Sequence, residues 1–478
     1  MIQRKHESMG MRAAAAFQFG SKYISMGASL VITAVLARLI TPSDFGLVAI
    51  VTVFIGLFTM FSDMGVGTAI VQYRDLTEED YEGIFGFSIL LAIALSALFC
   101  FISPFIAMFY SDDRLMGLCL AASPTLLFST LNMVPNGLML KDKRFDRIAL
   151  RLVVATVVSG LIAIIAAYLG AGAVAVVMQS ALSAAIVLAW NLYSRPIRNV
   201  NLHFIAPLKK IFSYSAYQFG FFLINYFSRN LDNILVGRFL GSAQLGYYDK
   251  AYKLTTYPLS AFSSVIGSII QPFMAEHQNN RDIVFAYWMK IEKLISLLAA
   301  PIAVICFCCS AEIVTILYGP GWEQAIPVFE TLSVSIYFQM LGNAGGSFYQ
   351  SLGHTDLLFK NGLINTCITV ICLLLGLSFG SILTVAYGIA IAYCLHIIAM
   401  SYYLLIRCFG KSPICLRAFL PEVISCLFAG AVCFLVFNFI ELPLLPSFVI
   451  KLLVLIGITF FAYWRTGQLS YFRQLLSR

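Results

Sequence analysis

The sequence is poor in charge. Asp, Glu, Lys and Arg make up 11% of its 478 residues, and hydrophobic residues make up 60%. An ordinary soluble domain has roughly a quarter charged residues, so the composition excludes a cytosolic globular enzyme, a disordered chain and a fibrous protein. The 12 Cys are too few for a disulfide scaffold, and most lie within apolar runs. The class that remains is a multi-pass membrane protein.

Motifs for catalysis and nucleotide binding are also missing. The chain has no G-x-x-x-x-G-K-[ST] phosphate loop, no H-E-x-x-H zinc motif and no nucleophile elbow. Cys306, Cys308 and Cys309 lie in an apolar run without a nearby His, so we expect packing rather than a metal site there. We therefore expect no enzyme activity, no cofactor, no metal and no nucleic-acid partner. Any transport has to run down an existing gradient.

Apolar runs fill most of the chain. A helix needs about 20 largely apolar residues to cross a bilayer, and runs of this length are not the short alternating strands of a barrel. The sequence therefore predicts an all-α protein with about 14 transmembrane helices, the first of them an uncleaved span rather than a signal peptide. The ninth is the least regular, because Lys290, Glu292 and Lys293 interrupt its start. Their approximate limits are 14–39, 43–70, 84–109, 115–139, 147–169, 171–193, 211–240, 243–274, 286–308, 325–351, 357–379, 381–406, 417–440 and 445–464.

Positive charge gathers on one side of these spans. With the N-terminus in the cytoplasm, the inside segments hold 20 Lys and Arg residues, and the outside loops hold only Arg38, Arg114 and Arg238. Cytoplasmic loops of membrane proteins carry this kind of excess. We therefore expect both termini to be cytoplasmic.

An internal repeat relates the two halves of the chain. FQFGSKYI from Phe17 aligns with YQFGFFLI from Tyr217, and VLARLITPSDFG aligns with LVGRFLGSAQLG, without a gap at an offset of 200 residues. Each repeat begins after an even number of spans, so the repeats have the same orientation and predict two parallel six-helix lobes. The predicted domains are an N-terminal lobe at 1–193, a cytoplasmic linker at 194–210, a C-terminal lobe at 211–407, and two extra helices with a cytoplasmic tail at 408–478.

Polar side chains lie inside several spans, where each charge costs roughly 2.5–3.5 kcal/mol and so usually faces a cavity or a partner. They recur at helical spacing at the start of both repeats, which predicts a water-filled, net cationic cavity between the lobes. The basic candidates are Lys22, Arg229, Lys250 and Lys253; the polar lining candidates are Gln18, Ser25, Gln218, Asn225 and Tyr257; and the acidic candidates, for coupling or ion pairing, are Asp63, Asp232 and Asp249.

Simpler roles are open for some of these charges. Arg229 with Asp232, and Asp249 with Lys253, have the spacing of structural ion pairs within one helix. Lys250 lies only a turn or two into its span, so it can also extend to the outer membrane interface.

Two further candidates differ in the strength of their support. Lys22 is about three turns into its helix and has no acidic residue three or four positions away, so it is the strongest candidate for a cavity residue. Asp63 lies near the end of its span, where a helix cap or an ion pair is as good an interpretation as a proton site.

Two segments at the start of the repeats resemble the signatures of a known family. Residues 35–72, VLARLITPSDFGLVAIVTVFIGLFTMFSDMGVGTAIVQ, resemble the first signature of the bacterial polysaccharide transporter family, and residues 237–258, GRFLGSAQLGYYDKAYKLTTYP, resemble the second. The likeness extends over most of the chain. It is closest to exopolysaccharide flippases of the colanic-acid and teichuronic-acid type, within the multidrug/oligosaccharidyl-lipid/polysaccharide exporter superfamily.

The resemblance implies a function. It implies flipping of undecaprenyl-pyrophosphate-linked oligosaccharide repeat units to the periplasmic leaflet of the bacterial inner membrane, by alternating access, for exopolysaccharide, capsule or lipopolysaccharide biosynthesis. The implied partners are the lipid-linked oligosaccharide and membrane lipids, with the polysaccharide polymerase and chain-length machinery as further candidates, and the protein is expected to be monomeric. The family's cationic lumen matches the four basic candidates by location only.

Three other functions stay open at this point. One is a purely structural assembly subunit, which would leave the costly intramembrane charges without a purpose. A cation-coupled exporter of drugs or other lipid precursors in the same superfamily would favour acidic cavity residues, whereas the charges here are net basic. A membrane-embedded glycosyltransferase or polymerase would usually need larger extramembrane loops than these short connections.

Overall fold

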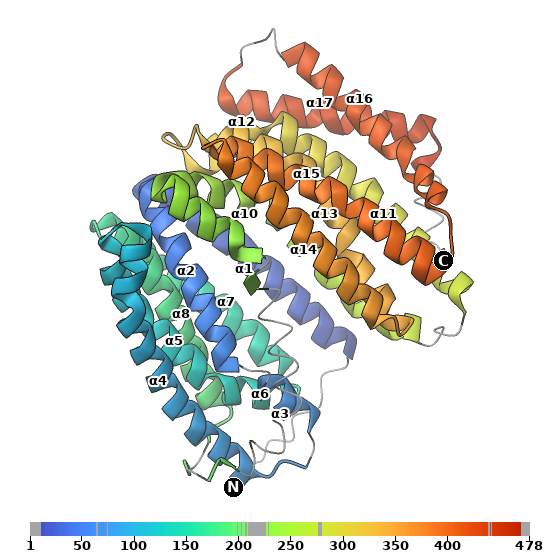
Figure 1. Ribbon diagram of the computed structural model, residues 1–478. Helices are drawn as coiled ribbons and strands as arrows, with labels where there is room; N and C mark the ends of the chain where they lie inside the picture. Colours follow the sequence, from blue (N-terminus) through green and yellow to red (C-terminus); the bar gives the residue numbers. More distant parts are fainter. Residues whose placement is uncertain are drawn as a thin grey trace. The chain divides into compact units, whose positions relative to one another are not determined.

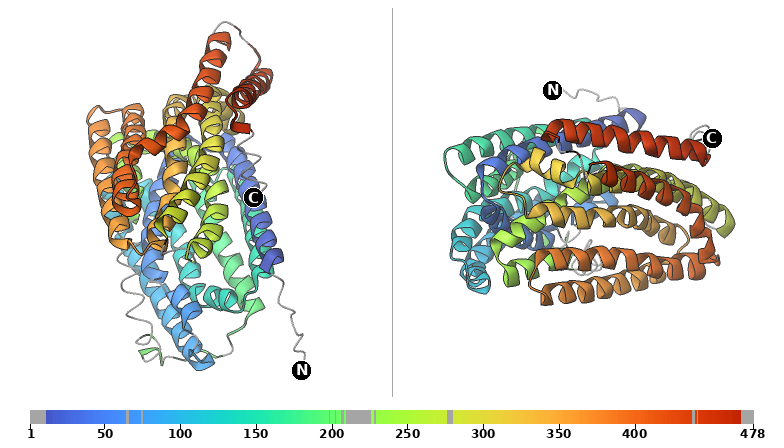
Figure 2. Two further views of the ribbon diagram at one scale, coloured as in Figure 1. Left: turned by 90° about the vertical axis from the view of Figure 1, so that its right-hand side faces the viewer. Right: turned by 90° about the horizontal axis from the view of Figure 1, so that it is seen from above.

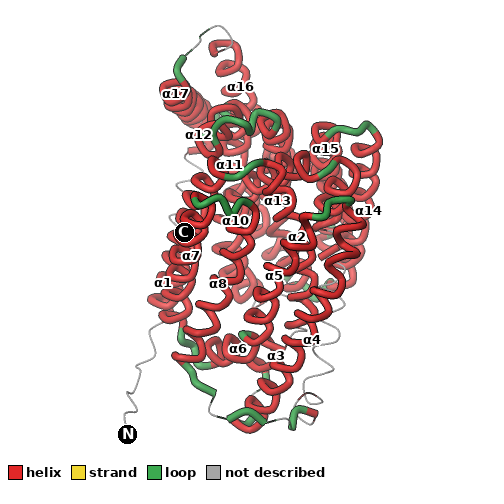
Figure 3. The backbone as a smooth tube through the Cα atoms, turned by 90° about the vertical axis from the view of Figure 1, so that its left-hand side faces the viewer, coloured by secondary structure: helices red, strands yellow, loops and turns green. Residues whose placement is uncertain are grey.

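Helices make up all the regular secondary structure in the described part of the chain (Figure 3). The structure is a computed structural model that describes residues 11–469 except 64–65, 74, 198, 202, 206–207, 209–225, 228, 276–279, 438–439 and 441. The chain divides into two compact units, Met1–Gly246 and Tyr247–Arg478. The predicted lobes and the linker at 194–210 remain a prediction.

The predicted membrane spans correspond closely to helices. Within the described residues, 12 helical stretches are long and apolar enough to cross a membrane, and each coincides with one predicted span. The all-α, multi-pass prediction is therefore confirmed. The predicted span 243–274 coincides with α10 (Ser242–Ala275), whereas much of the predicted span 211–240 lies outside the described residues.

Eight helices of the first unit lie between Met11 and Ser194 in the described part of the chain. They are α1 (Met11–Leu39), α2 (Pro42–Asp63), α3 (Val66–Gln72), α4 (Glu78–Tyr110), α5 (Arg114–Leu131), α6 (Met133–Lys141), α7 (Phe145–Tyr168) and α8 (Ala173–Ser194). Helix α1 packs along α7, α4 packs along α5, and both α5 and α7 pack along α8 (Figure 1).

Local chemistry sets where these helices begin and break. Thr77 caps α4, because its hydroxyl accepts from the amide of Asp80 while the Asp80 carboxylate accepts from the amide of Thr77. The predicted fourth span is divided into α5 and α6 at Asn132. Pro135 has no amide hydrogen to donate to the carbonyl of Leu131, which weakens the helix at this point.

The second unit begins within α10 and includes all the later helices. They are α11 (Arg281–Cys308), α12 (Ser310–Tyr318), α13 (Ala325–Ser351), α14 (Thr355–Ser378), α15 (Ile382–Met400), a π-helical segment (Ser401–Phe409), a 3₁₀ segment (Pro413–Phe419), α16 (Leu420–Phe437) and α17 (Leu444–Arg465). Helix α13 packs between α11 and α15, and α14 packs on α15. The two extra helices, α16 and α17 (red in Figure 2), lie beside each other and pack on α11 and α12.

Two ion pairs, one buried and one partly buried, hold the extra helices. Lys293 of α11 lies 2.6 Å from Glu422 of α16, and Lys451 of α17 lies 2.6 Å from Glu312 of α12. Lys293, one of the three charges that interrupt the ninth predicted span, is thus paired with Glu422 of the thirteenth. Each extra helix has its own charged anchor in the rest of the second unit.

Candidate functional site

The predicted polar face of α1 is protected within the first unit. Ser21 and Ser25 are 8% and 7% exposed, and Lys22 is half-buried, whereas Ile24 and Val31 are 60% and 62% exposed. The Ser21 hydroxyl donates to the carbonyl of Gln18 at 3.0 Å, while the side chain of Gln18 is exposed. The shielded side of α1 is therefore polar at Ser21 and Ser25 and becomes apolar further along, where Ile32 and Leu36 are 7% and 2% exposed.

At the start of α10, the charged residues are packed tightly. Asp249 and Lys250 are each 5% exposed. Asp249 pairs with Lys253 at 2.8 Å, which is the ion pair that their spacing allowed, and the Lys253 side chain stays half-exposed. Tyr318 donates to the backbone carbonyl of Lys250 at 3.3 Å. Lys253 is thus the accessible cation of this group, whereas Lys250 is enclosed.

The other predicted site residues are less concentrated. Arg229 is exposed, Asp232 is buried and Tyr257 is half-buried. Three predicted positions cannot be placed, because Gln218, Asn225 and the side chain of Asp63 lie outside the described residues.

The two repeats meet at matching glycines. A Cβ at Gly46 would lie 1.7 Å from the backbone oxygen of Ser242, and one at Gly246 would lie 1.9 Å from that of Pro42. Only glycine permits such an approach of two backbones. Ser43 and Ser242 share a hydrogen bond of 3.0 Å at the same crossing. The offset of 200 residues relates the two glycine contacts, so the repeat seen in the sequence is also present in space.

An arginine braces this crossing. Arg114 pairs with Asp112 at 2.8 Å, donates to the hydroxyl of Ser43 at 3.2 Å and lies 3.8 Å from Asp44. Its side-chain hydrogen bond lowers the pKa of the Asp112 carboxyl. Arg114, one of the three arginines predicted in the outside loops, therefore has a structural role next to the start of α2.

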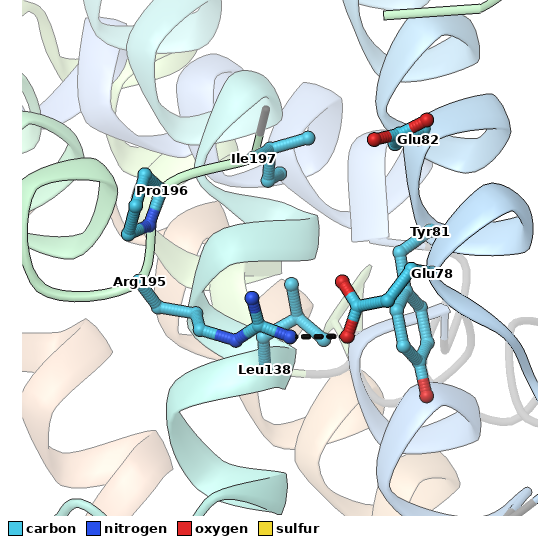
Figure 4. Close-up of a pocket in the computed structure, with 7 residues that line it drawn as sticks. All are labelled: Glu78, Tyr81, Glu82, Leu138, Arg195, Pro196 and Ile197. Carbon is cyan, nitrogen blue, oxygen red and sulfur yellow. Dashed lines mark hydrogen bonds and ion pairs between the residues drawn. The ribbon is translucent and has the colours of Figure 1, made fainter. Parts of the chain in front are cut away.

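A small cavity lies where the chain leaves α8 (Figure 4). Its volume is about 320 Å³. Arg195 donates to Glu78 at 2.5 Å and lies 3.2 Å from Asp142, which ties the segment after α8 to α4 and to the end of α6. The lining has two carboxylates and one guanidinium, so it does not suit an anionic ligand. The lining residues are Glu78, Tyr81, Glu82, Leu138, Arg195, Pro196 and Ile197.

The first unit also contains a buried cation that is not among the predicted site residues. Arg151 of α7 is 9% exposed. It donates to the amide oxygens of Asn191 and, at 2.7 Å, Asn136, while Asn191 donates to Asn132 at 2.7 Å. No Asp or Glu among the described residues pairs with Arg151. The sequence signal for Arg151 was a charge inside the fifth predicted span. Arg151 is so close to the start of that span that it resembles a residue at the membrane boundary.

A family comparison matches more than half of the chain. Residues 35–327 match the family model described as "Polysaccharide biosynthesis protein". The chain is 27% identical to the teichuronic acid biosynthesis protein TuaB of Bacillus subtilis (strain 168), covering 69% of this chain and 68% of that protein. It is 22% identical to the lipopolysaccharide biosynthesis protein WzxC of Escherichia coli (strain K12), covering 80% and 78%.

Solved structures share the fold. The structure is similar to an inward closed conformation of the lipid II flippase MurJ, with a TM-score of 0.77 and 15% identity over 96% of this chain and 99% of that one. An inward-facing multidrug resistance MATE family transporter is also similar, with a TM-score of 0.59 and 16% identity over 80% and 94%. At these identities the likeness concerns the fold alone.

Proposed function

Because this chain belongs to the polysaccharide biosynthesis protein family, we propose that it is a flippase for undecaprenyl-pyrophosphate-linked oligosaccharide repeat units. It moves them from the cytoplasmic to the periplasmic leaflet by alternating access, for exopolysaccharide, capsule or lipopolysaccharide biosynthesis. It works in the bacterial inner membrane with both termini in the cytoplasm. The observation that carries the proposal is the presence of basic side chains within apolar helices at the start of both repeats.

The chemistry of the substrate accounts for these basic residues. A diphosphate cannot cross hydrocarbon unaided, and basic side chains attract it more strongly in a low-dielectric site than in bulk water. Lys22 and Arg229 supply positive charge in the first unit, and Lys253 supplies it in the second. Lys250 is assigned the same role, but it must first become accessible, because its side chain is enclosed in this conformation.

Uncharged polar groups suit the sugars. The hydroxyl of Ser25 is buried and has no hydrogen-bond partner among the described residues. Such a group can replace the hydration of a sugar hydroxyl, as can the exposed amide of Gln18. The prenyl chain is as apolar as the bilayer and can remain in it throughout.

The test is a deletion strain of the host, analysed by mass spectrometry of prenyl-linked intermediates. Complete repeat units should accumulate on the cytoplasmic leaflet, and the wild-type gene should remove them. Lys22→Ala and Arg229→Ala should abolish surface polysaccharide at normal protein levels. Lys360→Ala is the matched control, because Lys360 is exposed and pairs with Asp356 at 3.7 Å. Repeat units that reach the periplasm at the usual rate without the protein would refute the proposal.

A further inference from the structure

The interior of the second unit contains three charged side chains that the proposed substrate site does not use. Glu292, Lys293 and Glu422 are 1%, 7% and 0% exposed. Lys293 pairs with Glu422 at 2.6 Å and also donates to the backbone carbonyl of Ala418. Glu292 lies about 16 Å from the start of α11, measured along the helix axis, which places the cluster well inside the span.

Glu292 differs from Lys293 and Glu422 because no ion pair among the described residues includes it. Neither of its carboxylate oxygens has a hydrogen-bond partner among the described residues. One turn earlier, the indole N–H of Trp288 points at this carboxyl, and it is the one neutral donor that the described residues bring to it. One turn later, Ser296 is already engaged by the hydroxyl of Tyr337 at 3.0 Å.

The charges of the cluster do not balance. Two carboxylates share one ammonium, and Lys293 is committed to Glu422. An ionised carboxylate that is buried without a partner is strongly unfavourable, so the cluster needs one more positive charge. That charge has to reach Glu292 itself.

The surroundings favour a proton over a metal ion. The groups that face the cluster from the neighbouring helices are Tyr337 of α13, within electrostatic reach of both carboxylates, Cys426 of α16 and Tyr463 of α17. A small metal cation takes about six oxygen ligands, and the described residues contain no group of three or more His, Cys, Asp or Glu that could hold one. A proton needs a single carboxylate oxygen.

We propose that Glu292 is a proton-binding site and that the proton bound there is the coupling cation of transport. The first part stands on the geometry alone, and the second rests on the function proposed above. Binding converts the carboxylate to a neutral carboxylic acid and consumes nothing else. The protonated site allows α11 and α16 to stay closed around the Lys293–Glu422 pair, whereas loss of the proton leaves an excess charge that favours hydration and separation of these helices.

Infrared difference spectroscopy of the full-length protein in lipid nanodiscs tests the proton site. A protonated-carboxyl stretch should be present at neutral pH, disappear in Glu292→Gln and shift in Glu292→Asp, which also guards against a variant that fails to fold. Glu323→Gln is the matched control, because Glu323 lies in an exposed loop of the same unit. A band that is absent from the wild type, or unchanged in both Glu292 variants, would overturn the proposal.

Proteoliposomes that contain a pH-sensitive dye and the lipid-linked intermediate from the deletion strain test the coupling. Wild type and Glu323→Gln should consume an imposed proton gradient as the lipid is flipped. In Glu292→Gln, the rate of proton uptake and the rate of lipid flipping should each fall at least 10-fold. Normal proton-coupled flipping by Glu292→Gln, or flipping driven by sodium alone, would overturn the coupling role. If the wild type flips nothing, the proposed function fails, and the infrared result still decides the proton site.

Discussion

The first unit buries a cation among amides, whereas the second buries an ion pair beside an extra carboxyl. Arg151 is held by neutral oxygens of Asn191 and Asn136. Lys293 is held by Glu422, and Glu292 lies one position away along the chain without a charged partner among the described residues. Both arrangements place charge inside apolar helices, but they satisfy it in opposite ways.

The two units differ in whether the net charge of their interior can change. A guanidinium does not lose its proton in proteins, and amides do not titrate, so the polar network of the first unit has a constant charge. A carboxyl can bind or release a proton. A response to a cation gradient therefore fits the second unit, and the network around Arg151 fits a scaffold that stays the same throughout.

The largest effect is expected when the buried pair of the second unit is broken. Glu422→Leu leaves the Lys293 ammonium uncompensated and should cost about 3–5 kcal/mol of stability. Adding Lys293→Met should restore most of it, because the ammonium is then gone and the protonated Glu292 is neutral. The thermal midpoint in detergent measures both variants, and Asp356→Asn, in an exposed pair with Lys360, should change it little. A double variant as unstable as the single one would mean that the pair is not an isolated electrostatic unit.

A smaller loss is expected from the corresponding change in the first unit. Arg151→Met removes the donor from the amide oxygens of Asn191 and Asn136 and should cost about 2–3 kcal/mol, because both acceptors stay buried. Since no titratable partner is involved, the loss should be the same from pH 6 to pH 8. Thermal unfolding across that range is the measurement. A strong pH dependence would show that an acid balances Arg151 after all.

The repeats allow a comparison that does not depend on charge. Gly46→Ala and Gly246→Ala should each cost about 1–3 kcal/mol by overpacking, because each added methyl meets a backbone oxygen. Gly20→Ala on α1 has open space and should be neutral or slightly stabilising. Unfolding of the three variants in the same detergent provides the comparison. Equal tolerance at all three positions would contradict the close crossing of α2 and α10.

The smallest effect is expected at the surface. Asp112→Asn removes the pair with Arg114 and should cost less than about 1 kcal/mol, because the pair is largely solvated. The pKa of Asp112 is lowered in the folded protein, so the contribution is present above the ordinary aspartate pKa, about 3.9, and is lost as the pH falls through the lowered value. The wild type and the variant should therefore converge in acid. A gap that widens in acid would contradict the assignment.

The helices were predictable because their signal is local. A bilayer requires a long apolar run for each span, so both ends of α17 and the C-terminal end of α4 follow closely from composition. The repeat was also predictable, because FGSKY and its neighbours align without a gap. Local signals likewise indicated the Asp249–Lys253 pair, which lies within one helical turn.

The partners of the buried charges were not predictable. Glu422 is far from Lys293 in the sequence, and no local pattern links a carboxylate of one span to an ammonium of another. The same holds for Arg151, whose two asparagine partners come from α6 and from α8. Lys250 is contacted by Tyr318, which lies far along the chain. The spacing of residues within α10 cannot reveal such a contact.

The glycine crossing has a thermodynamic corollary. A methyl group on either glycine forces the same widening between the two backbones, and once they have moved apart the second methyl finds its space already made. The penalties should therefore be strongly subadditive, with the doubly substituted chain scarcely worse than either single one. The first substitution of a glycine at this crossing should therefore lower the stability, and the second should lower it little further. Natural variants should then retain both glycines or neither.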